Sequence, residues 1–493
     1  MDLGLHGAHR LATAVAATLA LALLTGCAVN PATGKREFSL VSAEQELQIG
    51  REGYAAAIAE YGDYDDARLQ AYVDSVGQRV ARASELPNLE WHFTVLDDPV
   101  VNAFAMPGGY IYITRGILAH LSSEAQLAGV LGHEIGHVTA RHSAKRITQQ
   151  QIAGLGLGLA GAFSETFRRY SGAAEQGLGL LLLKYGRDDE SQADALGIRY
   201  SLAAGYDPRE IPATYAMLKR IGERAGSALP FYLSTHPDPG DREQRTTALA
   251  ATAATGHTGL AIRQQGYLGR LRGVVFGPDP RGGYFEGARF YHPTLGFEMS
   301  FPEGWATQNG HSAVITQEGQ KQAFAQLTMA PNAGTQSPAE YVAALKRDGR
   351  VASAAGTSTT IGGWPAWVGH VTVPAAQGAT TGATLFAAWV RQSPDRLLQV
   401  LGQSAAVGDA NDAKLSALAH SMRPLQDARR ATPVPDKIVV APAPAAGTFS
   451  AVLARLGPCA VAIDDAAILN GVSADAAVSA GQWLKTVAPG KKQ

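Results

Sequence analysis

The stretch Leu131-Gly132-His133-Glu134-Ile135-Gly136-His137 decides how the rest of this sequence is interpreted. It follows Ser123 and Gln126, a capping-box pattern that predicts the start of a helix running to His142. Residues four positions apart lie on one helix face, so His133 and His137 can offer imidazole nitrogens to one metal ion. Glu134 lies about 100° further round the helix, where it can reach a water on the ion without displacing it. The stretch therefore predicts a metal-binding helix with Glu134 as general base.

A third metal ligand is predicted in a second acidic segment, Asp188-Asp189-Glu190-Ser191-Gln192-Ala193-Asp194. Catalytic zinc usually keeps three protein ligands and one open position. Glu190 and Asp194 are four positions apart on a predicted helix, 178–196, so both can face the first helix. We expect Glu190 to complete the ligand set and Asp194 to accept an imidazole N–H, that of His133. The alternative is a solvated acidic helix face, which is the interpretation for Asp188 and Asp189.

Composition limits the classes of function. Lysine and arginine number 42 against 43 aspartates and glutamates, a net charge of −1, and no basic stripe is present. A nucleic-acid-binding protein normally shows such an excess, so no nucleic-acid partner is expected. Hydrophobic residues make up 46% of 493 residues, enough for two or three buried cores.

The N-terminal segment has the pattern of an export signal. Arg10 precedes an apolar run, 11–24, which is too short to span a bilayer. Leu24-Thr25-Gly26-Cys27 looks like a bacterial lipobox, which implies cleavage before Cys27 and attachment of lipid to its sulfur. Ala28 after the cysteine favours sorting of the lipoprotein to the outer membrane. The alternative is an ordinary signal peptide with a cysteine near its end; Cys459, the second cysteine, is expected to be a small buried residue.

Changes of pattern divide the chain. We predict a signal peptide over 1–26, a polar tether over 27–41 and a metal-binding domain over 42–262, helical over 42–82. Within that domain, 102–106 and 110–114 flank Pro107-Gly108-Gly109 and predict a hairpin. A connector, 263–289, leads to a strand-rich α+β domain, 290–425, whose tryptophans are expected to lie in its core. An Ala/Pro linker, 426–446, precedes a last module, 447–493, with two helical patterns.

The metal-binding segments together resemble the HtpX-like gluzincin family of zinc metallopeptidases. The matching motifs are His133 to His137, Glu190 to Asp194, and Ser234-Thr235-His236-Pro237 followed by Arg242. The likeness covers roughly 42–250 and is to the soluble, lipid-tethered BepA and LoiP type. The segment Asn30-Pro31-Ala32-Thr33-Gly34-Lys35 also resembles the tether of that type. The fold class it implies is α+β: a mainly helical zincin-type catalytic domain with a short β-hairpin, an α+β accessory domain and a small C-terminal module. That module loosely resembles a LysM-like glycan module, or is a small helical cap.

The resemblance also implies roles for residues that no pattern singles out. Asn102, Ala103 and Phe104 look like the family's edge strand, which pairs with an extended substrate; a plain core hairpin is the alternative. His236 looks like the histidine that closes the site, capping zinc at rest or contacting the transition-state oxyanion. Arg242 is expected to pair with site carboxylates, unless it is a surface arginine. His142 lies off the predicted ligand face and receives no role.

The sequence thus predicts a zinc-dependent endopeptidase of the bacterial envelope with one Zn²⁺ per chain. The expected partners are protein or peptide substrates, unfolded or stalled envelope proteins, and a membrane held through lipid on Cys27. The expected location is periplasmic and lipid-anchored to the outer membrane, in quality control of outer-membrane proteins. The rival hypothesis is a lipid-tethered chaperone or assembly factor with a regulatory or vestigial metal site. Hydrolysis of a cell-wall glycopeptide is a third, drawn only from the C-terminal module.

Overall fold

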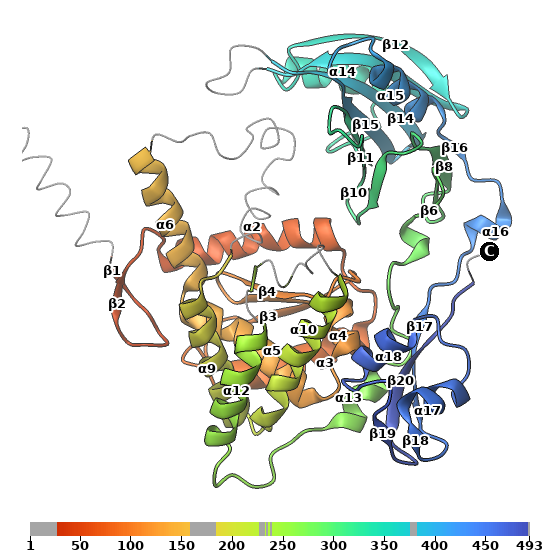
Figure 1. Cartoon of the computed structure of the whole chain (residues 1–493). Coiled ribbons are helices and arrows are strands. Elements are labelled where there is room, and N and C mark those ends of the chain that lie inside the picture. The colour runs from red at the N-terminus through yellow and green to blue at the C-terminus, as the bar shows by residue number, and fades with distance from the viewer. Residues whose placement is uncertain are drawn as a thin grey trace, which may run out of the picture.

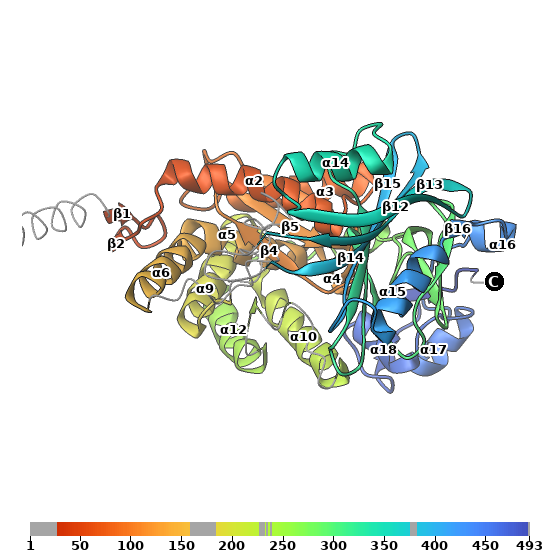
Figure 2. The ribbon, with the colours of Figure 1, turned by 90° about the horizontal axis from the view of Figure 1, so that it is seen from above.

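The computed structural model describes residues 27–157, 184–225, 232, 235–236, 239–374 and 382–491, and Figures 1 and 2 show it from two directions. Helices and several β-sheets are mixed along the chain, which confirms the predicted α+β class. Over these ranges, no helix is long and apolar enough to cross a membrane. The predicted signal segment, 1–26, lies outside them.

The predicted tether is folded rather than loose. Strands β1 (Cys27–Val29) and β2 (Arg36–Phe38) pair antiparallel, with Cys27 opposite Phe38. Asn30 holds the connecting turn, because its side-chain oxygen accepts from the Ala32 N–H at 3.0 Å. The segment predicted to be a tether thus contains an ordered turn, because one asparagine side chain satisfies backbone polar groups there.

The helical stretch predicted over 42–82 is two helices, α2 (Ala43–Tyr61) and α3 (Ala67–Ala81). Gly62 between them has φ of 76°, a left-handed conformation that glycine adopts without strain. Two residues on, the Tyr64 N–H donates to the Val95 carbonyl at 3.0 Å. The chain therefore leaves the helix to contact strand β3 (His92–Leu96), a tertiary contact that helical periodicity does not reveal.

The hairpin predicted around Pro107-Gly108-Gly109 is present as β4 (Ala103–Met106) and β5 (Tyr110–Thr114). Both glycines of the turn have positive φ, 82° and 93°. Strand β3 pairs parallel with β5 on the other side, giving the order β3-β5-β4. Strand β4 is consequently an edge: no other strand in the described ranges pairs with its outer side.

Helix α5 (Glu124–Thr139) carries the predicted metal motif and is buried along its whole length. Ser123 caps it as predicted, since its side chain accepts from the Gln126 N–H. It ends at Thr139 rather than continuing to His142. Arg141 has φ of 55°, and α6 (His142–Leu157) starts in a new direction.

The second predicted helix is α9, and its bounds differ from the prediction. Its described part begins at Arg187 and runs on to Ala203, beyond the predicted end at 196, while 178–183 lie outside the described residues. Gly205 then turns the chain with φ of 87°, and α10 (Ile211–Ala225) follows.

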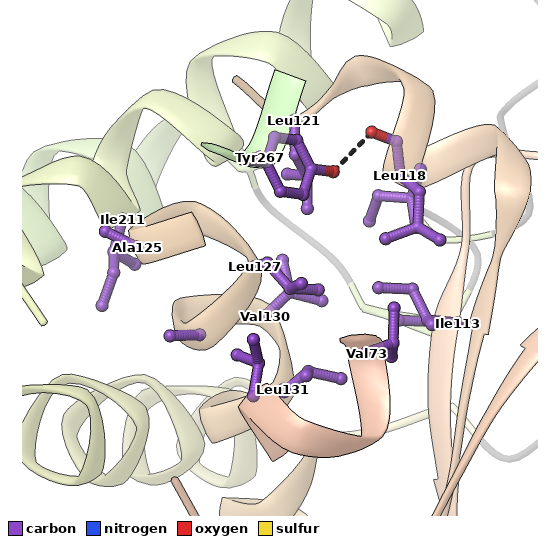
Figure 3. Packing of buried hydrophobic residues seen from close by; sticks show 14 of the residues in the cluster. Val73, Ile113, Leu118, Leu121, Ala125, Leu127, Val130, Leu131, Ile211 and Tyr267 are labelled. Carbon is purple, nitrogen blue, oxygen red and sulfur yellow. Dashed lines mark hydrogen bonds between the residues drawn. The ribbon is translucent and has the colours of Figure 1, made fainter. Parts of the chain in front are cut away.

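The main hydrophobic core surrounds α5, as Figure 3 shows. Residues of this helix meet α3, β5 and α10 through these side chains: Val73, Ile113, Leu127, Val130, Leu131 and Ile211. Tyr267 joins them and donates its hydroxyl to the Leu118 carbonyl at 2.6 Å (Figure 3). Because Tyr267 belongs to α13 (Gln264–Arg270), the first part of the predicted connector packs in the core.

A second region follows, built on antiparallel sheets. Its seven-stranded sheet has the order β12-β13-β14-β15-β11-β10-β9, with strands β9 (Ala306–Asn309), β10 (Ala313–Gln317), β11 (Phe324–Met329), β12 (Ser353–Ile361), β13 (Trp364–Thr372), β14 (Thr384–Ser393) and β15 (Arg396–Gln403). A four-stranded sheet, order β16-β8-β7-β6, contains β6 (Tyr284–Glu286), β7 (Arg289–His292), β8 (Phe297–Ser300) and β16 (Arg423–Pro424). Helices α14 (Pro338–Arg347) and α15 (Ala410–His420) cover opposite faces of the larger sheet. Trp305, Trp367 and Trp389 are buried there, as expected of core residues.

The last described segment packs back onto the main core. Strand β17 (Lys437–Pro442) pairs with β20 (Trp483–Ala488), and α17 (Phe449–Arg455) and α18 (Ile463–Leu469) lie between them in sequence. Residues 437–442 of the segment predicted to be a linker form this strand, because alternate side chains of the Val- and Ile-containing stretch are buried. Ile438 and Val487 join the same cluster as Leu131. Lys485 is buried and donates from Nζ to the carbonyls of Ala119 at 2.9 Å and Leu121 at 2.6 Å.

Candidate metal centre

Helices α5 and α9 approach each other through glycines. A Cβ on Gly197 would lie 2.9 Å from the backbone nitrogen of His133, and one on Gly132 would lie 3.1 Å from the Gly197 carbonyl. One turn further along α5, a Cβ on Gly136 would lie 3.2 Å from the backbone of Ala193. Side chains at these positions would push the helices apart. The close crossing therefore lets residues of both helices meet at one point.

Four side chains converge there: His133 and His137 from α5, Glu190 from α9, and His236. Each offers one ligand atom, and these atoms all lie within 4.8 Å of one another. The Nε2 atoms of His133 and His137 are 3.0 Å apart, and each lies 3.6 Å from a Glu190 carboxylate oxygen. His236 places Nδ1 2.9 Å from Glu190 Oε1. All four are buried.

Asp194 fixes the ring of His133. Its Oδ1 lies 3.1 Å from His133 Nδ1. An ionised carboxylate can only accept, so this contact requires the proton on Nδ1 and leaves a lone pair on Nε2. The structure thus places Asp194 where the spacing on α9 predicts it.

His142 fixes the ring of His137, and sequence reasoning missed it. His142 Nε2 lies 3.0 Å from the Gln192 oxygen, an acceptor, so the proton is on Nε2 and Nδ1 accepts. Its Nδ1 lies 2.9 Å from His137 Nδ1, which must then donate. Burial lowers the pKa of both His137 and His142, which favours these neutral forms. The break at Arg141, where the helix prediction continued, returns His142 towards the site.

In these tautomers the Nε2 atoms of His133 and His137 both carry a lone pair and lie 3.0 Å apart, with Nη2 of Arg242 3.3 Å from the former. Such an arrangement is repulsive unless a cation accepts both. Nitrogen donors with a carboxylate oxygen form a set that suits a divalent transition metal. The residues present therefore fit a metal ion.

Arg242 balances the negative charge of the site. It comes from α12 (Pro239–Ala253) and forms 2.6 Å ion pairs with both Glu190 and Asp194. Burial raises the pKa of Glu190, but attraction to His236 and Arg242 outweighs this effect and lowers the pKa to about 2. For Asp194, burial is likewise outweighed, by Arg242 and His133, and its pKa lies well below the ordinary value. Both carboxylates therefore stay ionised over the physiological range.

Glu134 is an unsatisfied group of the site, as is Nε2 of His236. It is buried, and neither carboxylate oxygen has a hydrogen-bond partner among the described residues. Burial raises the pKa of its carboxyl above the ordinary value, against the attraction of His236 and His133. A buried carboxyl without a partner is costly for the fold and indicates a functional position.

Aromatic rings enclose the site, and no pattern in the sequence had pointed to them. Tyr185 stacks on His137 with ring centroids 3.9 Å apart, and Tyr232 stacks on His236 at 4.5 Å. Tyr215 donates its hydroxyl to Asp194 Oδ1 at 2.7 Å.

Asp189, expected to be solvated, is instead buried and pairs with Lys145 at 2.9 Å and Arg146 at 2.8 Å.

The other predicted site residues lie apart from the metal group. Ala103 and Phe104 lie in edge strand β4, with Asn102 immediately before it. Asn102 is buried, and both atoms of its side-chain amide lack a partner within the described ranges. Cys27 lies in β1, opposite Phe38.

Comparison with known proteins agrees with this geometry. Residues 67–250 match the model of Peptidase family M48, which agrees with the predicted resemblance to a metallopeptidase family. The mitochondrial metalloendopeptidase OMA1 of Schizosaccharomyces pombe is 32% identical over 42% of this chain and 61% of its own length. OMA1 of Arabidopsis thaliana is 35% identical over 42% of this chain and 40% of its own length. The β-barrel assembly-enhancing protease of Escherichia coli K12 is 28% identical over 43% of this chain and 45% of its own length.

This chain therefore spans between 40% and 61% of the length of these relatives. Among solved structures, PsbP of Synechocystis sp. PCC 6803 is similar over 30% of this chain and 98% of its own, at 13% identity and a TM-score of 0.22. A TM-score this low supports no conclusion on fold or function.

We predict that His142→Ala weakens metal binding about 10- to 100-fold, because the His137 ring loses the acceptor that holds its tautomer and orientation. The measurement is competition with a chelator on the full chain, with thermal unfolding monitored in parallel. Ser191→Ala is the matched control: Ser191 neighbours Gln192, but its hydroxyl donates only to the Arg187 carbonyl on an exposed face. Wild-type metal affinity in a folded His142→Ala protein would show that the contact is structural only.

Proposed function

We propose that this protein is a zinc-dependent endopeptidase, with one zinc held by His133, His137 and Glu190. The observation that carries the proposal is the buried convergence of these three side chains beside a buried carboxyl, Glu134, that has no hydrogen-bond partner among the described residues. Two imidazoles and one carboxylate form one of the common ligand sets of catalytic zinc. The endopeptidase names of the M48 relatives support the same chemistry.

When bound, zinc would supply Lewis acidity, polarising the scissile carbonyl and making a water acidic. Glu134 accepts the proton of the attacking water and then delivers it to the nitrogen of the leaving amine. A raised pKa suits this role, because a carboxyl that titrates nearer neutrality can both take up and release a proton. Asp194 and Arg242 act through other groups: the first orients His133 and the second neutralises the carboxylates.

The proposed substrate is an extended segment of a protein. Strand β4 offers its free edge for pairing, and β-strand addition needs such an edge. Asn102 adds a buried amide with both a donor and an acceptor unused, which a peptide backbone would satisfy. An unfolded or stalled protein exposes such segments, whereas a folded one does not.

We further propose that the enzyme works in the bacterial envelope, in the periplasm, on the quality control of outer-membrane proteins. The lipobox-like Leu24-Thr25-Gly26-Cys27 supports lipid on Cys27 and attachment to the outer membrane. The name of the E. coli relative, a β-barrel assembly-enhancing protease, supports the substrate class. The domain division stays as predicted at 42–262 and 290–425, with the C-terminal module proposed to be LysM-like.

A chaperone or assembly factor is the second candidate. The observation that favours it is His236, a fourth protein donor where catalytic sites keep an open position. Stoichiometric zinc without cleavage in any form of the protein would support this alternative over the peptidase.

We expect Glu134→Gln to retain about one zinc per chain and to lose cleavage by at least about 100-fold, because an amide cannot accept the proton. Zinc content and casein hydrolysis are measured on the same preparation. Asp188→Asn is the control, since Asp188 is an exposed residue in the first turn of α9. Cleavage at the wild-type rate by Glu134→Gln would falsify the assignment of the base.

We expect His236→Ala to cleave faster than wild type while keeping its zinc, because three ligands remain and the fourth position opens. This follows if His236 closes the site at rest, a role supported by the gathering of all four donors. His257→Ala, at an exposed histidine, controls for general effects of the substitution. Slower cleavage with zinc retained would instead indicate that His236 contacts the transition-state oxyanion.

We expect Asn102→Ala to raise KM for a peptide substrate with little change in kcat or melting temperature, because its amide gives up no bond within the protein. Asn30→Ala is the control for which the reverse result is expected, a change in stability without a change in KM. The Asn30 amide donates to the Ala140 carbonyl at 3.0 Å, so its loss lowers stability by roughly 1–3 kcal/mol and leaves KM unchanged. A lowered melting temperature with unchanged KM for Asn102→Ala would make Asn102 a structural residue.

A further inference from the structure

The folded hairpin at the start of the described chain exposes large apolar side chains. Val29 is 56% exposed, Phe38 39% and Leu40 41%. They lie within a dozen residues of one another, around the backbone pair of Cys27 and Phe38. We call these three residues the hairpin surface. Single exposed hydrophobic residues are ordinary, but a group of them marks an interaction site.

A largely apolar cavity adjoins this surface. Its volume is about 320 Å³, and Ala28, Val29, Pro31, Leu47, Leu89 and Val138 are among its lining residues. Val29 thus belongs both to the exposed surface and to the cavity wall. The apolar character continues from the hairpin onto the body of the protein.

The hairpin surface is held firmly against the metal-binding helices. The side-chain amide of Asn30 donates to the Ala140 carbonyl at 3.0 Å, just after the end of α5. The Ala32 N–H donates to the Thr139 carbonyl at 3.2 Å, and the Leu40 N–H donates to Thr148 Oγ1 of α6 at 3.0 Å. Any body that binds the surface is therefore fixed in orientation relative to the metal centre.

Two cations lie on the same hairpin. Lys35 and Arg36 are exposed, and neither forms an ion pair with a residue of the described ranges. Cations near a membrane interact favourably with anionic headgroups. Exposed apolar side chains beside basic ones are the composition of a surface that lies in a lipid interface.

We propose that the hairpin surface inserts into the lipid bilayer, with Lys35 and Arg36 at the headgroups, and so orients the enzyme on the membrane. This rests on the proposed lipid on Cys27, because that anchor delivers the adjoining residues to the bilayer. A lipid on one cysteine ties a single point and leaves the protein free to rotate. Three inserted side chains on a hairpin bonded to α5 and α6 remove that freedom.

The test is fluorescence of the lipidated protein that begins at Cys27, reconstituted in anionic vesicles with and without brominated acyl chains. Phe38→Trp and Leu40→Trp each place a reporter on the hairpin surface, and Val407→Trp, at a position 59% exposed in the second region, is the matched control. The wild-type protein has six tryptophans, so its emission is subtracted from that of each variant. The difference is then compared between the two kinds of vesicle. Bromine is expected to quench the added emission of Phe38→Trp and Leu40→Trp and to leave Val407→Trp unchanged.

Equal emission from the hairpin reporters in both kinds of vesicle, with lipid on Cys27 shown by mass, overturns the proposal. Absence of lipid on Cys27 overturns the anchor and the proposal with it. Hydrolysis of soluble casein by the same preparations tests the peptidase separately: quenching in a protein without activity supports the hairpin surface and contradicts only the proposed enzyme.

Discussion

The close crossing of α5 and α9 is the constraint on which the rest of the structure depends. Gly132, Gly136 and Gly197 let the two backbones approach closely: a Cβ at Gly197 would force a shift, and one at Gly132 or Gly136 would make a contact tighter than usual. Only at that distance can imidazoles on one helix and carboxylates on the other share a single ion. The motif residues supply the chemistry, but the glycines supply the geometry in which it can operate.

Burial at this crossing makes every unpaired charge expensive, so the charges are arranged in a closed network. Arg242 pairs with Glu190 and Asp194, and Asp194 in turn holds His133. On the other side, Gln192 orients His142, which orients His137. The groups left over, the lone pairs of the two imidazoles and the carboxyl of Glu134, are those that a metal ion and its water would satisfy. Folding therefore pre-organises the site before any ligand arrives.

Local patterns were sufficient to predict the elements that carry the chemistry. The spacing in α5 and α9 predicts which side chains face each other, and the structure brings His133, His137, Glu190 and Asp194 together as that spacing requires. What the patterns did not reveal depends on tertiary contacts. His142 was misjudged because the argument assumed one continuous helix, whereas Arg141 breaks it. The strands within the predicted tether and linker were not foreseen, because both segments look polar or proline-rich. Strand β1 pairs with the nearby β2, and β17 pairs with the distant β20.

The return of the last described strands to the main core has a consequence for biogenesis. Ile438 and Val487 belong to the same hydrophobic cluster as Leu131, which directly precedes the metal motif, and buried Lys485 bonds to carbonyls at the end of the helix over 115–120. A chain still being synthesised lacks these residues, so part of the core around α5 stays open to water until they have been made. The helix that carries the metal motif therefore gains its full packing only after the last described strand has been added.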